Sequence, residues 1–217
     1  QAASFWWTMG VNQSHQAVRT AQGIINLALL TGHIGRPGTG PNSITGQANA
    51  MGSRLFSNTT SLMGGYDFLN EAHRLHVAGI LGIDPQAIPK QNSWPYHRIL
   101  QGAKEGVVKG LWILATNPAH SWIDKSALPE VFGNLEFLVV QDLFLNETTK
   151  LAHLVLPGAS FLEKDGTFTN LERRIQRIRK VVDPPHGILP DWQVVCEVSR
   201  RMGYPMEYRH PSEIMDE

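Results

Sequence analysis

The sequence has a single cysteine, and this shortage excludes several classes of site. Cys196 alone cannot form a disulfide framework, nor a zinc or iron–sulfur site built from cysteines within this chain. The simplest interpretation is an intracellular, cytoplasmic protein. No run approaches the roughly 18 consecutive apolar residues that a membrane span needs, and residues 1–15 lack the basic-then-apolar build of a signal peptide. We therefore expect no membrane span.

Charge is also scarce, and it is unevenly placed. Lys plus Arg and Asp plus Glu both number 19, so the net charge of the 217 residues is zero, and charged residues make up 18% of the chain, against about 25% in an average protein. Between Gln1 and Tyr66 there is no Asp, Glu or Lys, and only Arg19, Arg36 and Arg54 carry charge. A site for an anion excludes carboxylates because like charges repel at close range. The segment therefore favours a cleft for an anionic ligand.

The first thirty residues predict a strand followed by an amphipathic helix. Residues 4–9 resemble the inside of a strand, and because the chain begins at Gln1 without a methionine, we expect it to be part of a longer polypeptide. Ser14 is a candidate N-cap for a helix over 15–31, and Gly32 is a candidate C-cap. The helical spacing of the apolar residues predicts one buried face: Ala17, Val18, Ala21, Ile24, Ile25, Ala28 and Leu29.

Residues 32–66 are rich in Gly, Asn, Ser, Thr and Gln. A polar segment of this length is longer than most connections, and we expect an ordered, irregular loop that lines a cofactor or an active site. Gly35, Gly38, Gly40 and Gly46 would let backbone N–H groups approach a phosphate. Their spacing matches neither common phosphate-loop pattern, so a plain irregular loop is the alternative.

Beyond residue 105 the pattern becomes that of a parallel α/β domain. Apolar runs at 111–115, 137–140 and 154–157 alternate with helical stretches near 124–132 and 147–152. Runs this apolar predict strands that are buried on both faces, and the alternation predicts a doubly wound, Rossmann-like, mostly parallel sheet with helices on both faces. Ligands of such sheets bind at the carboxyl ends of the strands. The segments expected at those ends are 9–13, 116–118 and 141–142.

Several single residues have both a functional and a structural interpretation. Asp142, with Gln141 at a strand end, could accept hydrogen bonds from a ribose or a base, or it could cap the next helix. Asn117 could contact a ligand or only form the turn before Pro118. Cys196 is expected to be a small core residue rather than a catalytic thiolate.

Two other patterns favour structural interpretations. His73 and His76 lie three residues apart on a predicted helix, where a solvated face is favoured over a metal site because no third ligand is near. Residues 173–180 alternate basic and apolar side chains, which predicts a half-exposed strand or helix face. A pI near 7.3 and the absence of interleaved aromatic residues argue against nucleic-acid binding.

The order of the motifs along the chain is more informative than any one of them. The segments are Thr8-Met9-Gly10-Val11-Asn12-Gln13, residues 29–38, residues 45–52, Ala115-Thr116-Asn117-Pro118, Val140-Gln141-Asp142 and residues 163–174. In this order they closely resemble the molybdopterin oxidoreductases of the dimethyl-sulfoxide-reductase superfamily, over nearly the whole chain. The resemblance implies a molybdenum bis(molybdopterin guanine dinucleotide) cofactor and a [4Fe–4S] cluster.

The resemblance also implies roles for individual residues. Met9, Gln13 and Thr45 are expected near the metal and the substrate, with Met9 and Gln13 also contacting the pterin. Asn117, Gln141 and Asp142 are expected to hold the dinucleotide, the last two at its guanosine end. Lys164 and Asp191 fall on further cofactor-binding positions. Amides donate to phosphate and pterin, and a carboxylate suits ribose hydroxyls or guanine N–H groups, so these assignments are chemically coherent.

Two branches of the superfamily compete for the function. The segment 40–47 resembles assimilatory and periplasmic nitrate reductases, in which a small hydroxyl residue stands at the position of Thr45. Formate dehydrogenases have an arginine there that holds the substrate carboxylate. Thr45 cannot make that contact, so we expect nitrate reduction, with formate dehydrogenase as the alternative. Asn42 departs from the aromatic residue that many nitrate reductases have there.

Parts of the superfamily's catalytic subunit have no counterpart in these residues. They are the N-terminal cysteine motif for the cluster, the protein ligand of molybdenum and the domain for the second dinucleotide. We therefore expect residues 1–217 to be a central dinucleotide-binding domain, with the loop 32–66 within it, to hold no metal ligand and to be inactive alone. The full protein would take electrons from a donor protein or subunit and could be periplasmic. A stand-alone nucleotide-binding module without catalysis is the remaining alternative.

Overall fold

The computed structural model describes residues 1–56, 62–122, 124–204 and 206–217. The chain divides into two compact units. The first unit contains Gln1–Leu55 and Phe168–Gln176, and the second contains Phe56–Thr167 and Arg177–Glu217. Each unit contains a parallel sheet of its own.

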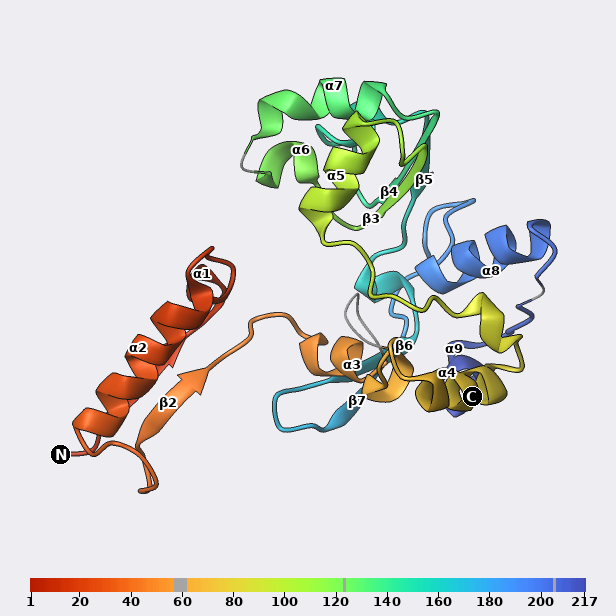
Figure 1. The fold of residues 1–217 in the computed structure, drawn as a ribbon. Helices are drawn as coiled ribbons and strands as arrows, with labels where there is room; N and C mark the ends of the chain where they lie inside the picture. The colour runs from red at the N-terminus through yellow and green to blue at the C-terminus, as the bar shows by residue number, and fades with distance from the viewer. Residues whose placement is uncertain (57–61, 123, 205) are drawn as a thin grey trace. The chain divides into compact units, whose positions relative to one another are not determined.

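The first unit is a small βαβ arrangement (Figure 1). Strands β1 (Ser4–Trp7) and β2 (Gly40–Ser43) pair in parallel, with Ser4 opposite Gly40 and Trp7 opposite Ser43. Parallel neighbours need a long crossover connection, which here contains α1 (Met9–Asn12) and α2 (Ala17–Leu30). Helix α2 packs against both strands. The carboxyl ends of β1 and β2 therefore lie at the same edge.

Helix α2 confirms the predicted helix but begins later than expected. The predicted N-cap, Ser14, is wrong, because Gln16 occupies the N-cap position and the Ser14 hydroxyl accepts from the Gln16 backbone N–H in the preceding turn. At the other end Gly32 has a φ of 68°, and the N–H of His33 bonds to the carbonyl of Ala28. This is a Schellman ending, in which the left-handed residue is glycine because it has no Cβ to clash.

The predicted buried face of α2 is only partly covered. Ala28 is fully buried, whereas Val18 is 71% exposed and Leu29 is 51% exposed. The remaining predicted positions are half-buried: Ala17, Ala21, Ile24 and Ile25. Two short strands are too narrow to cover a helical face with so many apolar residues. The expectation was right for the centre of the stripe and wrong for its margins.

The segment predicted as an irregular loop contains more regular structure than expected. Besides β2 it includes α3 (Ala50–Leu55) and the 3₁₀ turn η1 (Met63–Gly65). Part of the predicted loop, residues 57–61, lies outside the described residues. The glycines at 35, 38 and 40 all have positive φ, so the chain turns sharply before and into β2.

The second unit is built on three parallel strands in the order β3–β4–β5. These are β3 (Gly110–Leu114), β4 (Phe137–Asp142) and β5 (Leu154–Pro157), with Leu114 opposite Gln141 and Gln141 opposite Leu156. All three lie where the apolar runs predicted strands. The predicted α/β class with parallel strands is confirmed.

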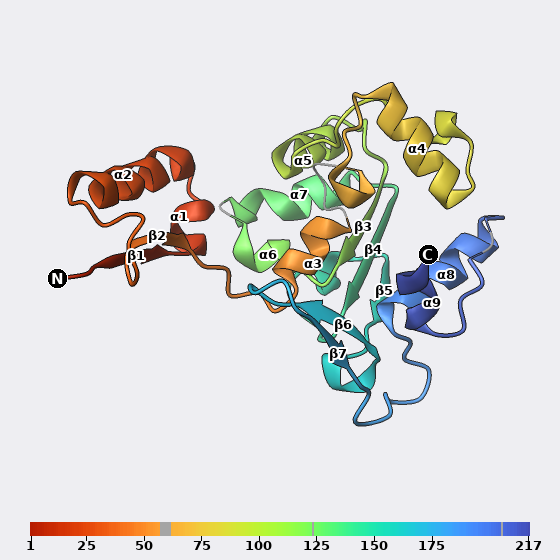
Figure 2. The same cartoon turned by 90° about the horizontal axis from the view of Figure 1, so that it is seen from below.

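The core of the second unit lies between one face of this sheet and two helices, α5 (Tyr96–Lys104) and α7 (Leu128–Gly133). Phe132 and Leu138 meet there, with exposed fractions of 2% and zero. The other buried members of the cluster are Ala103, Ile113, Leu128, Val131, Leu135 and Val140. In Figure 2, α5, α6 (Pro118–Ser121) and α7 lie on one side of the sheet and α8 (Asp191–Arg201) on the other.

The opposite face of the sheet is less covered than its sequence suggested. Leu114, Phe137 and Leu154 alternate with the core residues, and they are 43%, 50% and 43% exposed. The prediction of strands buried on both faces is therefore wrong for this face within the described residues. Gln141 lies on the same face but is 1% exposed, because the start of α8 reaches it.

Further elements lie outside these two parallel sheets. Strands β6 (Gly166–Thr169) and β7 (Ile175–Ile178) form a hairpin, and β7 confirms that the basic alternating stretch contains a largely exposed strand. The others are α4 (Glu71–Leu81), η2 (Pro85–Ala87), η3 (Lys125–Ala127), η4 (Thr149–Leu151), η5 (Phe161–Glu163) and α9 (Pro211–Asp216). The helix expected over 147–152 is only the 3₁₀ turn η4. No helix in the described part of the chain is long and apolar enough to cross a membrane.

Candidate functional site

The carboxyl edge of the first unit brings together the residues predicted near metal and substrate. Met9 opens α1, two residues after β1 ends, and Gln13 follows α1 as its C-cap. Thr45 follows β2 by two residues. Because β1 and β2 are parallel, all three come from the same edge. Met9 and Thr45 are half-buried and Gln13 is exposed.

A chain of side-chain hydrogen bonds ties α1 to β2 at this edge. The indole N–H of Trp7 donates to Asn12 Oδ1 over 3.0 Å, and Asn12 Nδ2 donates to the Ser43 hydroxyl over 3.1 Å. Every member of this chain is neutral. The only carboxylate side chain in the first unit is Glu172, so the edge offers hydroxyl and amide groups without a local negative charge. Such an edge is compatible with a small anion.

The carboxyl edge of the second unit is a charged network around Asp191. Asp191 Oδ1 accepts from the side-chain amide of Gln141 over 2.7 Å, and Oδ2 accepts from Lys164 Nζ over 2.5 Å. These residues were predicted separately as cofactor positions, and the structure places them in contact. Lys164 and Asp191 keep 31% and 45% of their side chains exposed, so a ligand can still reach the ion pair.

Gln141 presents an acceptor without a partner in this network. A carboxylate can only accept, so the Gln141 amide nitrogen must face Asp191, and the orientation of the amide is fixed. Its oxygen, Oε1, is buried and has no hydrogen-bond partner among the residues that the structure describes. An unpaired buried acceptor costs about 1–3 kcal/mol. A ligand N–H or O–H group that reached this oxygen would remove that cost.

Asp142, the last residue of β4, is held in a tight turn. Its Oδ1 accepts from the Leu143 backbone N–H over 2.6 Å, and its Oδ2 accepts from Asn146 Nδ2 over 2.8 Å. Asn146 Oδ1 in turn accepts from the N–H groups of Thr148 and Thr149. Asp142 thus has a local role in the turn after β4, while the N-cap of the following 3₁₀ turn is Thr148. A carboxylate offers about four acceptor positions, so two remain for a ligand.

Asn117 uses both ends of its side chain within the protein. Its Nδ2 donates to Glu147 Oε2 over 2.8 Å, and its Oδ1 accepts from the Thr148 hydroxyl over 2.6 Å. The hydrogen bond from Asn117 is the main reason why the pKa of Glu147 is lowered from its ordinary value. Asn117 therefore links the end of β3 to the turn after β4, and a ligand would have to share or replace these bonds.

The backbone turns abruptly just before Asn117. Ala115 has a φ of 51°, in the left-handed region that residues with a Cβ rarely adopt. Its N–H still donates to the carbonyl of Gln141 over 2.8 Å, so the chain leaves the sheet immediately after this bond. Strain of this kind, of order 1–3 kcal/mol, concentrates at functional sites. It directs Thr116 and Asn117 along the edge that carries Gln141.

The sequence did not identify Thr148 as a site residue, and the structure does. Thr148 is fully buried, accepts from the backbone N–H of Ala119 and donates to Asn117. A polar run, Asn146–Thr149, directly after a buried strand is the signal that could have found it. Glu147 lies in the same polar run and was also not identified from the sequence.

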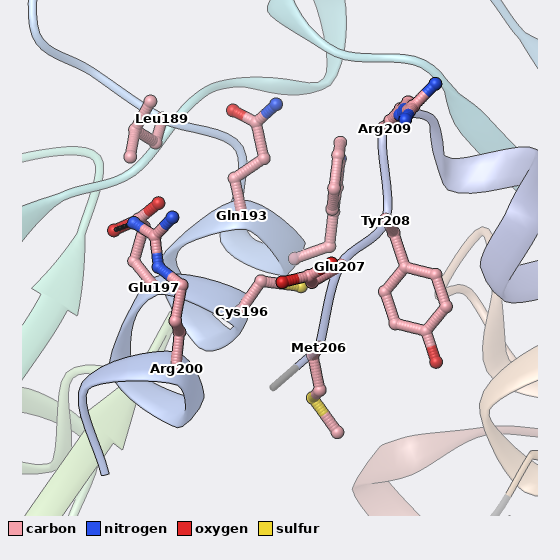
Figure 3. A pocket seen from close by; sticks show the side chains of 10 residues that line it. Leu189, Gln193, Cys196, Glu197, Arg200, Met206, Glu207, Tyr208 and Arg209 are labelled. Atoms are coloured by element: carbon pink, nitrogen blue, oxygen red, sulfur yellow. Dashed lines mark hydrogen bonds and ion pairs between the residues drawn. The ribbon is translucent and has the colours of Figure 1, made fainter. Parts of the chain in front are cut away.

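The described part of the second unit also contains a hollow beside α8 (Figure 3). It has a volume of about 460 Å³ and lies between α8 and residues 206–209. Cys196 and Met206 face it, flanked by Glu197 and Arg200, which form an ion pair over 2.5 Å. Burial raises the pKa of the Cys196 thiol, so the group stays protonated. Cys196 is half-buried, closer to the predicted core residue than to a thiolate nucleophile.

The two histidines on α4 have an aromatic contact. The rings of His73 and His76 both contact the ring of Tyr66 edge-on, with 5.0 Å between the ring centroids in each pair. His73 Nδ1 also accepts from the Asp67 backbone N–H. His73 is half-buried and His76 is exposed. Within residues 1–56, 62–122, 124–204 and 206–217, no group of three or more His, Cys, Asp or Glu side chains could hold a metal ion.

Comparisons with known proteins agree with the motif order. Residues 1–201 match the molybdopterin oxidoreductase family. The chain is 34% identical to formate dehydrogenase H of Escherichia coli (strain K12), over 100% of this chain and 30% of that protein. It is 38% identical to a nitrate reductase of Synechocystis, over 95% of this chain and 30% of that protein. It is also 38% identical to an assimilatory nitrate reductase of Haloferax mediterranei, over 98% of this chain and 30% of that protein.

These relatives include both nitrate reductases and formate dehydrogenases at similar identity, so they do not separate the two activities. The chain covers about 30% of their length. The family match itself extends over almost the whole chain. The 217 residues therefore belong to the molybdopterin oxidoreductase family.

Proposed function

We propose that this chain holds the guanosine end of a molybdopterin guanine dinucleotide at the carboxyl edge of β3–β4–β5, within an enzyme that reduces nitrate to nitrite. Membership of the family implies a molybdenum–pterin cofactor and an oxidoreductase. The observation that carries the proposal is the unpartnered Oε1 of Gln141, beside Asp142 and the Lys164–Asp191 pair. Guanine N–H groups are donors that match such a set of acceptors.

The residues at this edge would divide the work by their chemistry. Gln141 Oε1 would accept from a base N–H or a ribose O–H, because its amide nitrogen is already held by Asp191. The two free acceptor positions of Asp142 would take further donors of the guanosine. Lys164 would offer positive charge to a phosphate, and the ion pair with Asp191 would hold the Lys164 ammonium group in place. These acceptors, together with the Lys164 ammonium group, thus fit a nucleoside joined to phosphate.

The carboxyl edge of β1–β2 would serve the substrate end of the cofactor. When bound, the molybdenum group supplies the oxygen-atom transfer and the storage of two electrons. Met9, Gln13 and Thr45 would line the space around it, with the neutral chain Trp7–Asn12–Ser43 behind them. The absence of carboxylates before Asp67 lowers the repulsion that an incoming anion would meet.

Nitrate is favoured over formate by one side chain. Thr45 has a hydroxyl that can donate one hydrogen bond to an anion, but it has no guanidinium that could hold a carboxylate through two parallel bonds. Formate oxidation is the second candidate, because relatives of both kinds match this chain at similar identity. The cluster, the molybdenum ligand and the electron donor would belong to other parts of the full protein.

The direct test uses the full-length catalytic subunit with its cofactors. Reduced viologen and nitrate should yield nitrite, and the same enzyme should not reduce oxidised dye with formate. Dye reduction by formate without any nitrite formation would contradict the nitrate assignment and support the second candidate. A subunit that contains no guanine nucleotide after acid extraction would contradict the proposed cofactor site, whichever substrate is used.

A further inference from the structure

Asn49 and Gly52 lie just after the segment that carries Thr45, and their geometry is unusual. Asn49 immediately precedes α3, and Gly52 is buried in its first turn. We propose that these two residues form a latch that positions the segment Thr45–Ala48, and with it the anion end of the site. The latch is a property of the first unit alone. Its effect on substrate rests on the proposed function above.

The latch closes through a long-range hydrogen bond. Asn49 Oδ1 accepts from the backbone N–H of Thr169 over 2.9 Å, although 120 residues separate the two in sequence. An asparagine before a helix ordinarily caps that helix by accepting from one of its first free N–H groups. Here Asn49 Oδ1 accepts from β6 instead. The start of α3 is therefore fastened to the strand that ends at Thr169.

Gly52 is required for this arrangement by space rather than by backbone freedom. A Cβ built on Gly52 would overlap Asn49 Oδ1 and lie 3.0 Å from its Cγ. Carbon and oxygen that are not bonded do not approach so closely. Any side chain at position 52 would push the Asn49 amide away, and the amide cannot move without losing Thr169. Gly52 thus leaves the space in which the Asn49 amide keeps its hydrogen bond to Thr169.

A second anchor holds the other end of the same segment. The backbone N–H of Ile44 donates to the carbonyl of Trp7, the last residue of β1, over 2.9 Å. Residues 45–48 therefore lie between a fixed point on β1 and a fixed point on β6. Four residues between two anchors have few conformations available. Thr45, half-buried next to the first anchor, keeps its position because both ends of the span are fastened.

Hydrogen exchange on the full-length holoenzyme tests the latch without reference to any substrate. Asn49→Ala should speed the exchange of the Thr169 amide at least tenfold and also raise exchange in residues 45–48. Asn49→Asp keeps an acceptor oxygen and should restore the protection of Thr169. Gly23→Ala is the matched control for a glycine change, because nothing lies within 4 Å of a Cβ at that helical position. Unchanged exchange at Thr169 in Asn49→Ala would overturn the latch.

A double-mutant cycle tests the claim that the two residues act together. Gly52→Ala alone should speed exchange of the Thr169 amide as Asn49→Ala does. In the Asn49→Ala background the obstruction is gone, so adding Gly52→Ala should cause no further loss of protection. It should instead raise the melting temperature slightly, because alanine is the better helix former. Equal and additive losses in both backgrounds would contradict the coupling.

Steady-state kinetics test the positioning role. With whichever of nitrate or formate the wild-type enzyme turns over, Asn49→Ala should raise KM about tenfold, with less than a threefold change in kcat and unchanged cofactor content. An altered exchange pattern with an unaltered KM would overturn the positioning role while leaving the latch in place. An enzyme inactive with both anions would refute the proposed function, and exchange in residues 45–48 would still decide whether the latch holds that segment.

Discussion

The two carboxyl edges of this protein differ in the charge of their side chains. At the edge of β1–β2, neutral hydroxyl and amide groups link α1 to β2, and the surrounding unit has one carboxylate. At the edge of β3–β4–β5, Asp142 and Asp191 accept four hydrogen bonds between them, one of them from Lys164. The first edge suits an incoming anion, and the second suits a ligand with many donors.

The two units also differ in how far their apolar surface is covered. The second unit has a cluster of eight buried apolar residues between sheet and helices, whereas Ala28 is the only buried residue of α2. The apolar face of α2 is therefore less covered than the core of the second unit.

The largest expected effect tests the difference in burial between the two units. Phe132→Ala should destabilise the second unit by about 3–5 kcal/mol, because it removes a side chain that is 2% exposed. Leu30→Ala, at a position that is 86% exposed, should change stability by less than about 0.5 kcal/mol. Urea unfolding of the 217-residue chain, followed by exchange in peptides from each unit, measures both. A destabilisation of more than about 2 kcal/mol by Leu30→Ala would mean that other residues cover the Leu30 side chain on α2.

The next effect concerns the charged edge. Asp142→Ala removes an acceptor at the proposed guanosine site, and hydrogen bonds to a charged group contribute about 1.5–3 kcal/mol each. Guanine nucleotide recovered from the full-length variant should fall at least several-fold. Asn146→Ala is the matched control, because it loosens the same turn but leaves the carboxylate. Unchanged nucleotide content in Asp142→Ala would leave this residue only its role in the turn.

A charge placed at the neutral edge should have a smaller effect. At an effective dielectric constant of about 20, two like charges about 8 Å apart repel by about 2 kcal/mol. Thr45→Glu should therefore raise KM for nitrate at least tenfold, while Thr45→Gln, of similar size but neutral, should raise it less. Steady-state assays at two salt concentrations separate charge from size. Equal KM values for the two variants would mean that the neutrality of this edge does not matter for substrate.

The smallest effect is a pH dependence at the charged edge. The pKa of Glu147 is lowered, chiefly by the hydrogen bond from Asn117. A group whose folded pKa is depressed stabilises the fold above its ordinary pKa, and that contribution is lost as pH falls through the folded value. Asn117→Ala should return the pKa of Glu147 toward 4.5. Carboxyl chemical shifts measured between pH 2 and 7 would check this, and an unchanged titration midpoint would contradict the assignment of cause.

Much of the fold could be predicted because it depends on local patterns. The run Leu154–Pro157 is strand β5 with the predicted bounds. Errors arose where neighbours decide the outcome. Val18 fits a buried helical stripe, yet the strands beneath are too narrow to cover it. The helix predicted over 147–152 is only the 3₁₀ turn η4, because a hydrophobic pattern does not reveal the side-chain bonds that Asn146 makes to Asp142 and to the turn.

The sequence by itself determined the class of the protein, the parallel strands and the segment without carboxylates. Residue types and their spacing suffice for these, because apolar periodicity and charge are properties of the chain. Only the tertiary structure decided that Asp191 meets both Gln141 and Lys164, and that Asn49 meets Thr169. Such contacts join residues 27 to 120 positions apart. They depend on strand register and helix placement. Local sequence preferences are too weak to fix these, so they are set only when the whole unit packs.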